Sequence, residues 1–375
     1  MNGPEQSSAL QARSERLDSY LAQDPANDQL LADAFDAAVA AGRFDAAARH
    51  VAAGLSAGGS APWRFRQATL AIAQRRLQEA RSLLEALDRE SEHPALRFNL
   101  AFVQFQLGLH EASAGLLEPL LDVLPGAPAL WLRSLHQLGE VERAWGWVEA
   151  AWLAGRTLDA ELCGIASLLA VDAERLVDAE QLADRALQQL PQQAEALVAK
   201  GSVALARQDA VLASKLASAA IDRRDDGRAR SLLGFARLLQ QDLRGALAEL
   251  ERAVALMPLH IGTWQGLGWT RLLLNDIPGA LDAFSHALGL DRNFAESHGA
   301  LAVALATAGE IEQARSHIEF ARRLDPHGMA AQYASLLLSG EGRNPAAVQR
   351  LAGQLLTGVR GGPKAQPPGE GPSNS

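Results

Sequence analysis

The chain has 375 residues, more than the roughly 250–300 at which one compact hydrophobic core stops growing, so it must divide into domains or extend as a repeat array. Its formal net charge of −9 excludes a general electrostatic attraction to nucleic acid, and we expect no nucleic-acid partner. The single cysteine, Cys163, excludes a disulfide framework or a paired-cysteine metal site within one chain.

The first 27 residues are predicted to hold a disordered start and one N-terminal capping helix. The segment before Ala9 is polar, whereas between Ala9 and Leu21 the apolar residues recur at helical spacing. The start lacks the basic residues and apolar core of a secretory signal, and no apolar run approaches the ~18–20 residues that a membrane helix needs. We therefore expect no direct membrane insertion and a cytoplasmic location.

From residue 28 to residue 328, helical segments alternate with short turns at a nearly constant interval. In the first of these turns, Gly42 is suited to the left-handed conformation that ends a helix. The fourth segment is compressed between Gly139 and Ala144. The predicted segments span about 28–60, 61–93, 94–127, 128–159, 160–193, 194–226, 227–260, 261–294 and 295–328.

The last segments show the clearest pattern, because residues 261–294 can be laid on residues 295–328 without a gap. Trp264, Leu267, Gly268, Ala280, Phe284 and Ala287 recur 34 residues later as His298, Leu301, Ala302, Ala314, Ile318 and Ala321. This order of large, small and branched side chains resembles the tetratricopeptide repeat, a helix-turn-helix unit of about 34 residues. The resemblance covers residues 28–328 and implies an all-α fold, a right-handed α-solenoid superhelix of about nine stacked repeats.

The small residues of this pattern have a packing explanation. Gly201, Gly234 and Gly268 place a small side chain on a first helix where the second helix is expected to cross close to its backbone. Alanines seven residues apart, two turns along one helix face, let the next repeat approach. These pairs are Ala213 and Ala220, Ala246 and Ala253, Ala280 and Ala287, and Ala314 and Ala321.

Beyond the repeats, residues 329–358 are predicted to form C-terminal capping helices. Residues 359–375 are rich in Gly, Pro and Ser and cannot bury enough apolar surface to fold, so we expect a disordered tail. Lys occurs at only three positions while Arg is frequent, which indicates GC-rich coding and leads us to expect a bacterial source.

Motifs that carry chemistry are weak in this sequence. There is no phosphate-binding loop ending in Gly-Lys-Ser or Gly-Lys-Thr, and no His-Glu-x-x-His zinc motif. Residues 54–58 match Gly-x-Ser-x-Gly, but they follow a helical pattern, whereas a nucleophile elbow needs a preceding strand. His317 with Asp325 or Glu312 is interpreted as a solvated helix face rather than a metal site. We expect no catalytic residue, no cofactor and no metal, and hence no enzyme.

The resemblance also implies where a partner would bind, since in this family the first helix of each repeat lines the inner, concave groove. Carrying that pattern onto this sequence gives a peptide-binding groove lined by Phe65, Arg66, Phe98, Asn99, Phe102, Phe105, Arg133, His136, Phe235, Gln265 and Trp269. Trp269 is the preferred aromatic contact for a ligand chain.

One group in this set suggests a more specific ligand. Family members that hold a peptide's terminal carboxylate use Lys, Arg and Asn on consecutive first helices. Arg66, Asn99 and Arg133 occupy similar places in three neighbouring repeats, although the full Lys and Asn set is not reproduced. A carboxylate or acidic-peptide site is therefore one interpretation, and simple solvation of the helices by these arginines is the other.

These observations predict a non-catalytic scaffold or adaptor that binds an extended peptide or a helix of a partner protein in its concave groove. The alternative is an accessory docking subunit of a separately encoded enzyme or of a cell-envelope or secretion machine.

Overall fold

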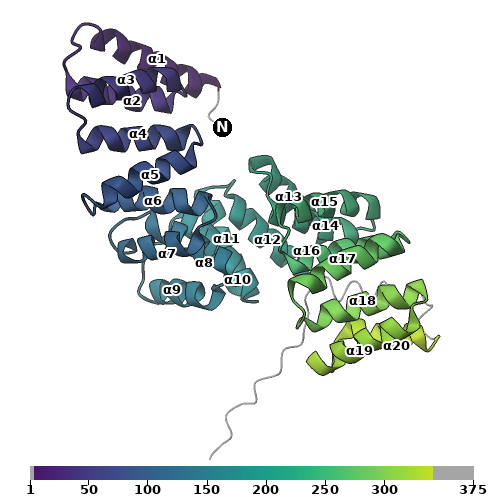
Figure 1. The fold of residues 1–375 in the computed structure, drawn as a ribbon. Helices are drawn as coiled ribbons and strands as arrows, with labels where there is room; N and C mark the ends of the chain where they lie inside the picture. The colour runs from purple at the N-terminus through teal and green to yellow at the C-terminus, as the bar shows by residue number, and fades with distance from the viewer. Residues whose placement is uncertain (1–3, 341–375) are drawn as a thin grey trace, which may run out of the picture. The chain divides into compact units, whose positions relative to one another are not determined.

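The computed structural model describes residues 4–340. The second C-terminal capping helix and the disordered tail predicted from the sequence lie outside these described residues. Within residues 4–340 every regular element is a helix, twenty α-helices and one short 3-10 helix (Figure 1). The prediction of an all-α helical repeat fold is confirmed.

The first helix, α1 (Pro4–Leu21), is longer than the sequence indicated. It begins at Pro4, whereas a disordered start was predicted as far as Ala9. Proline fits the first turn of a helix, because its fixed φ suits the helix and its missing N–H is not needed there. Helix α1 packs on α2, as an N-terminal cap would.

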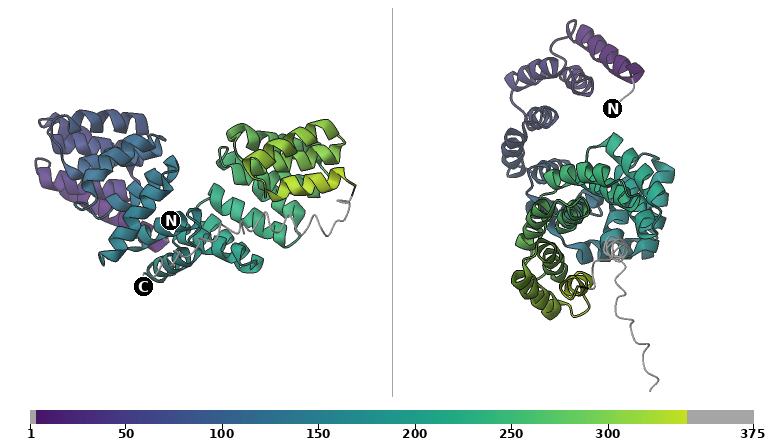
Figure 2. Two further views of the ribbon diagram at one scale, coloured as in Figure 1. Left: turned by 90° about the horizontal axis from the view of Figure 1, so that it is seen from below. Right: turned by 90° about the vertical axis from the view of Figure 1, so that its right-hand side faces the viewer.

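Nine helix pairs follow, and each corresponds to one predicted repeat. The first helices of the pairs are α2 (Asp28–Ala40), α4 (Ala61–Ala73), α6 (Pro94–Gln106), α8 (Ala127–Leu138), α10 (Ala160–Asp172), α12 (Ala194–Ala206), α14 (Gly227–Leu239), α16 (Ile261–Leu273) and α18 (Ala295–Ala308). The second helices are α3 (Phe44–Ser56), α5 (Leu77–Asp88), α7 (His110–Leu117), α9 (Val141–Leu153), α11 (Leu176–Gln189), α13 (Ala210–Arg223), α15 (Leu243–Leu256), α17 (Ile277–Leu290) and α19 (Ile311–Leu324). A last helix, α20 (Met329–Leu338), packs on both α18 and α19 (Figures 1 and 2).

The helices divide into two compact units. Unit 1 is Met1–Leu153 and contains α1 to α9, and unit 2 begins at Ala154 and contains α10 to α20. In unit 1 the third pair is irregular, because α7 gives way to the 3-10 helix η1 (Glu118–Leu120). Pro119 explains the change, since a proline inside a helix has no N–H to donate to the carbonyl oxygen one turn earlier.

Each pair turns through one residue in the left-handed conformation, just after the end of its first helix. These nine residues are Gly42, Arg75, Gly108, Gly139, Glu174, Gln208, Gln241, Asn275 and Gly309. The following N–H bonds back to the last turn of the first helix, as in the Arg175 N to Ala170 O bond of 2.8 Å. Five of the nine are not glycine, and a side chain is strained at these angles.

Close contact between helices depends on small residues, as the sequence predicted. A Cβ atom added to Gly234 would lie 2.6 Å from Leu250 Cγ on α15, and one added to Gly268 would lie 2.5 Å from Phe284 Cε1 on α17. At Gly201 the nearest atom is Leu232 Cδ2, 2.5 Å away, so there the first helix of the next repeat sets the constraint. The alanines spaced by seven residues in these repeats are buried.

In unit 2 the first helices are also linked to one another by polar side chains. Ser231 and Thr263 hydroxyls lie 3.1 Å apart, between α14 and α16, and Gln265 Nε2 donates to Ser297 Oγ at 3.2 Å, between α16 and α18. The two bonds join equivalent positions of the repeat at successive interfaces. A longer-range link is the pair of 3.0 Å bonds from the Arg228 guanidinium on α14 to the Asp172 carboxylate on α10, two repeats earlier.

No helix among residues 4–340 combines the length and the apolar character required to cross a bilayer.

The close-contact glycines give a first prediction. Gly268→Ala should lower the free energy of unfolding by about 1–3 kcal/mol, because the new methyl group overpacks the buried Phe284 ring. Gly146→Ala is the matched control, also inside a helix, where the new Cβ meets nothing within 4 Å. The control should gain about 0.5–1 kcal/mol from the helix preference of alanine. Urea denaturation of the full chain measures both, and equal effects would contradict the packing explanation.

The left-handed turn residues give a second prediction. Glu174→Gly should stabilise the protein by about 0.5–1 kcal/mol, because glycine adopts its φ of 58° without strain. Ala173→Gly, one residue earlier at φ −83°, should destabilise it through the greater freedom of glycine in the unfolded chain. Thermal denaturation of the two variants beside the wild type should therefore show shifts of opposite sign.

Candidate functional site

A row of half-buried side chains runs along two neighbouring first helices of unit 1. On α6, Phe98, Phe102 and Phe105 follow the i, i+4, i+7 spacing of one helix face, and each is only partly covered. On α4 the equivalent positions are Phe65, Thr69 and Ile72, also partly covered. We call these six side chains the first-helix stripe.

The stripe is anchored by the core beneath it. Phe65, Ile72 and Phe102 pack against the buried cluster that includes Leu84 and Leu100. At the end of α6, Phe105 meets the His110 ring edge-on, with 5.1 Å between ring centres. The exposed parts of these rings are therefore held in place rather than free to collapse into the core.

The polar residues predicted for the same face are partly occupied by contacts within the chain. Arg66 Nε lies 3.8 Å from Asp36 Oδ1 on α2, and its guanidinium lies 5.1 Å from the centre of the Trp63 ring. Asn99 Nδ2 donates to Ala95 O, one turn earlier on α6, at 2.8 Å. Arg133 and His136 are half-buried on α8. The structure thus places Arg66, Asn99 and Arg133 on consecutive first helices, but it turns Arg66 toward the preceding repeat.

In unit 2 the predicted residues lie differently. Phe235 packs over Gly266 on the next first helix, where an added Cβ would lie 2.4 Å from its Cε1 atom. Gln265 is half-buried and bonded to Ser297. Both therefore connect neighbouring first helices.

The prediction that Trp269 contacts a ligand is contradicted. Its side chain is 3% exposed and packs edge-on against Phe284, with 5.4 Å between ring centres. The reason is its direction on α16: α17 and α18 cover two sides of that helix, and Trp269 belongs to the buried cluster that they share. Trp269 is a core residue.

The Gly-x-Ser-x-Gly match lies at the end of a helix, as the helical pattern before it indicated, and not after a strand. Ser56 ends the helix α3, and its hydroxyl donates to Ala52 O at 2.8 Å. A Cβ added to Gly54 would lie 2.1 Å from Trp63 Cδ2, so this glycine makes room for an indole ring. Among the described residues 4–340, no group of three or more His, Cys, Asp or Glu side chains is arranged to hold a metal ion.

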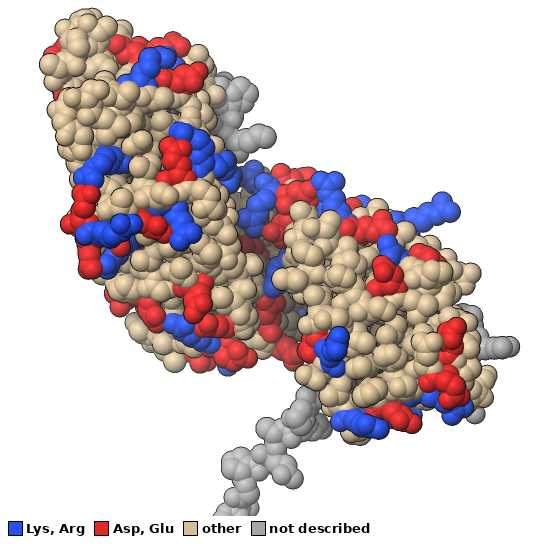
Figure 3. Space-filling model, in the orientation of Figure 1, with Lys and Arg blue, Asp and Glu red and all other residues tan. Residues whose placement is uncertain are grey.

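Charged side chains of both signs are interspersed on the face of each unit shown in Figure 3. Many are paired, as in the bidentate hydrogen bonds of Arg64 with Glu90 and of Arg207 with Glu180. Exposed pairs of this kind contribute only about 0–1 kcal/mol each. On this face neither unit presents a large area of one sign.

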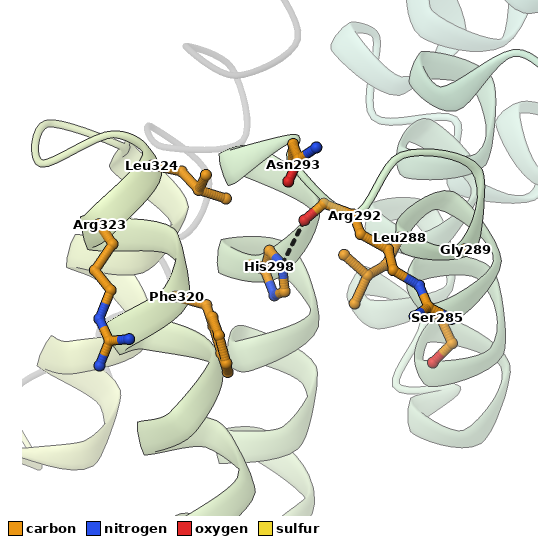
Figure 4. Close-up of a pocket in the computed structure, with 9 residues that line it drawn as sticks. All are labelled: Ser285, Leu288, Gly289, Arg292, Asn293, His298, Phe320, Arg323 and Leu324. Atoms are coloured by element: carbon orange, nitrogen blue, oxygen red, sulfur yellow. Dashed lines mark hydrogen bonds between the residues drawn. The ribbon is translucent and has the colours of Figure 1, made fainter.

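A pocket of about 670 Å³ lies in unit 2, on the side formed by second helices, where the sequence predicted no site (Figure 4). It is lined by Ser285, Leu288 and Gly289 of α17, Arg292 and Asn293 of the loop that follows, His298 of α18, and Phe320, Arg323 and Leu324 of α19. One signal was present in the sequence: Phe320 and Leu324 are apolar residues one turn apart on a helix that is otherwise polar on that side. They are 48% and 44% exposed.

One lining residue of the pocket, His298, is held in place by contacts of both its ring nitrogens. His298 Nε2 lies 3.0 Å from the Arg292 carbonyl oxygen and must donate to it, while His298 Nδ1 lies 2.9 Å from His317 Nδ1. One ring nitrogen of that second contact must carry a proton and the other must accept it. Burial, and then the neighbouring His298 ring, lower the pKa of His317 from its usual 6.5.

Comparison with known proteins agrees with the repeat geometry. A family model described as tetratricopeptide repeat matches residues 71–157. The segment from residue 71 to residue 157 is therefore a tetratricopeptide-repeat segment. No curated protein sequence matches the chain.

Several solved structures are similar to the chain in fold. The protein YrrB, reported as having an unusual peptide-binding site, is 22% identical over 47% of this chain and 92% of its own, with a TM-score of 0.38. PilF of Pseudomonas aeruginosa is 20% identical over 52% and 91%, with a TM-score of 0.42. The Cut9–Hcn1 assembly of APC/C is 14% identical over 91% and 81%, with a TM-score of 0.46. At these identities the likeness concerns the fold alone.

The histidine pair gives a third prediction. Because folding lowers the pKa of His317, unfolding takes up a proton between that lowered value and 6.5. This group therefore costs no stability above about pH 6.5 and reduces stability as the pH falls toward its lowered pKa. The stability difference between wild type and His317→Gln should shrink from about pH 7.5 to about pH 5.5 in urea denaturation. His327→Gln, at an exposed position of the same unit, is the control. A difference that stays constant with pH would contradict the assignment.

Proposed function

We propose that the chain is a non-catalytic tetratricopeptide-repeat scaffold and that the first-helix stripe of unit 1 binds an extended peptide or a helix of a partner protein. The observation that carries the proposal is the stripe itself: six side chains at equivalent places on the first helices of two consecutive repeats, four of them phenylalanine, and all only partly covered. Rings anchored by the core on one side offer apolar area at little cost in conformational entropy.

The polar group beside the stripe supports the same proposal. Asn99 follows Phe98 on α6 and donates one amide hydrogen to Ala95 O. Its second N–H and its carbonyl oxygen form no hydrogen bond among the described residues. An amide of this kind can donate to and accept from the backbone of an extended peptide. A ligand chain would then be held by rings through its side chains and by Asn99 through its backbone.

Peptide selection tests this proposal and gives a fourth prediction. Peptides selected from a displayed random library on the full chain should bind Phe102→Ala at least about tenfold more weakly, because a central anchor is lost. Asn99→Ala should also weaken them, without a change in the core. Val123→Ala removes a 61% exposed apolar side chain elsewhere in unit 1 and should leave binding unchanged.

Thermal denaturation of each variant separates loss of binding from loss of fold. If the selected peptides bind Phe102→Ala and Asn99→Ala as tightly as wild type while all chains remain folded, the stripe is not the binding surface.

A further inference from the structure

We propose that the pocket between α17, α18 and α19 is a second recognition site, which binds an internal peptide segment of a partner in which an acidic residue stands next to an aromatic or aliphatic one. The pocket belongs to unit 2 and is walled by two second helices (Figure 4). It shares no residue with the first-helix stripe, so the proposal stands independently of the function proposed above.

The charge of the pocket points to an acidic ligand. The nine lining residues include Arg292 and Arg323 and no Asp or Glu, in a chain whose net charge is −9. In the described part of the chain Arg292 forms no ion pair within 4.0 Å. Guanidinium groups bind carboxylates through charge-assisted hydrogen bonds, and two of them flank the pocket.

Two acidic side chains close to these arginines in the sequence do not neutralise them. Glu319 Oε2 lies 3.7 Å from the guanidinium of Arg323, but the two side chains are 70% and 73% exposed, so water screens their attraction. Asp291 precedes Arg292, and its Oδ1 accepts the backbone N–H of Asn293 at 2.8 Å. That carboxylate is therefore engaged with its own loop.

The apolar part of the pocket is rigid as well as exposed. Phe320 stacks on the His298 ring, with 5.4 Å between ring centres and 21° between planes, and the Arg323 guanidinium lies 5.7 Å from the Phe320 ring centre. His298 is itself fixed through both ring nitrogens. A surface held in this way loses little entropy when a ligand side chain packs on it.

The size of the pocket favours more than one ligand side chain. Its volume of about 670 Å³ falls within the roughly 300–1,000 Å³ range of pockets that hold small ligands. An acidic side chain near the arginines and a neighbouring apolar one on Phe320, Leu324 and Leu288 would fill it together. Gly289 leaves space on one side of the pocket, since a Cβ placed there would meet nothing within 4 Å.

Defined peptides test the proposal. The probe is an acetylated and amidated hexapeptide, Gly-Ser-Glu-Phe-Ser-Gly, and its partners replace Glu by Gln, or Phe by Ser. Binding is followed through the imidazole signals of the full chain carrying ¹³C-labelled histidine, with the His317 signal assigned from the His317→Gln variant. The Glu-Phe peptide should shift the His298 and His317 signals with a Kd of about 1 mM or lower, and each replacement should weaken it about two- to fivefold.

Variants of the protein locate the site. Gly289→Leu should abolish the shifts, because a Cβ at this lining position meets open space and the larger side chain built on it should occupy the pocket. Arg292→Gln and Arg323→Gln should each weaken binding about two- to fivefold. Arg244→Gln removes an exposed arginine from α15 and should change nothing. Phe102→Ala should also leave this binding intact, which distinguishes this pocket from the stripe.

Three results would overturn the proposal. The first is equal binding of the Glu and Gln peptides. The second is unchanged binding to a folded Gly289→Leu variant. The third is binding only by a peptide that ends in Phe with a free carboxylate, which would identify a chain end and not an internal acidic residue as the ligand.

Discussion

The fold depends on how closely one helix can approach the backbone of another. Where a first helix carries glycine, a large side chain of the facing helix takes the space: Leu250 over Gly234, and Phe284 over Gly268. A single methyl group at either glycine would fall well inside van der Waals contact. The helix pairs, and the direction in which each pair presents its remaining faces, follow from these contacts.

Polar bonds between first helices add a second level of order in unit 2. Ser231 with Thr263, and Gln265 with Ser297, satisfy buried or half-buried polar groups at two successive interfaces. Such bonds contribute modest stability, but leaving one partner unpaired is costly. Side chains that join neighbouring repeats are no longer available to a ligand. The first helices of unit 2 therefore differ from α4 and α6 of unit 1, whose aromatic side chains remain partly exposed.

The sequence predicted the helix pairs and the small contact residues well, because both arise from spacing that a helix repeats every turn. It predicted individual side-chain directions less well. Successive residues on a helix point about 100° apart, so Trp269, next to Gly268, lies in the core although a groove position was expected. The pocket around Phe320 was missed for a different reason: its residues come from three helices and a loop, and no spacing within one helix brings them together. The boundary between the two units, after Leu153, was also not predicted, because no clear break in the repeat spacing marks it in the sequence.

Repeat arrays are usually treated as chains in which each unit interacts with its immediate neighbours only. The Arg228–Asp172 pair departs from that description, because it joins the seventh repeat to the fifth and passes over the sixth. Unfolding of either the fifth or the seventh repeat separates these two charged groups, which lie 3.0 Å apart. The ion pair therefore favours cooperative unfolding of the three repeats. Cooperativity in this part of unit 2 therefore extends beyond the nearest neighbour, and its strength falls as salt screens the pair.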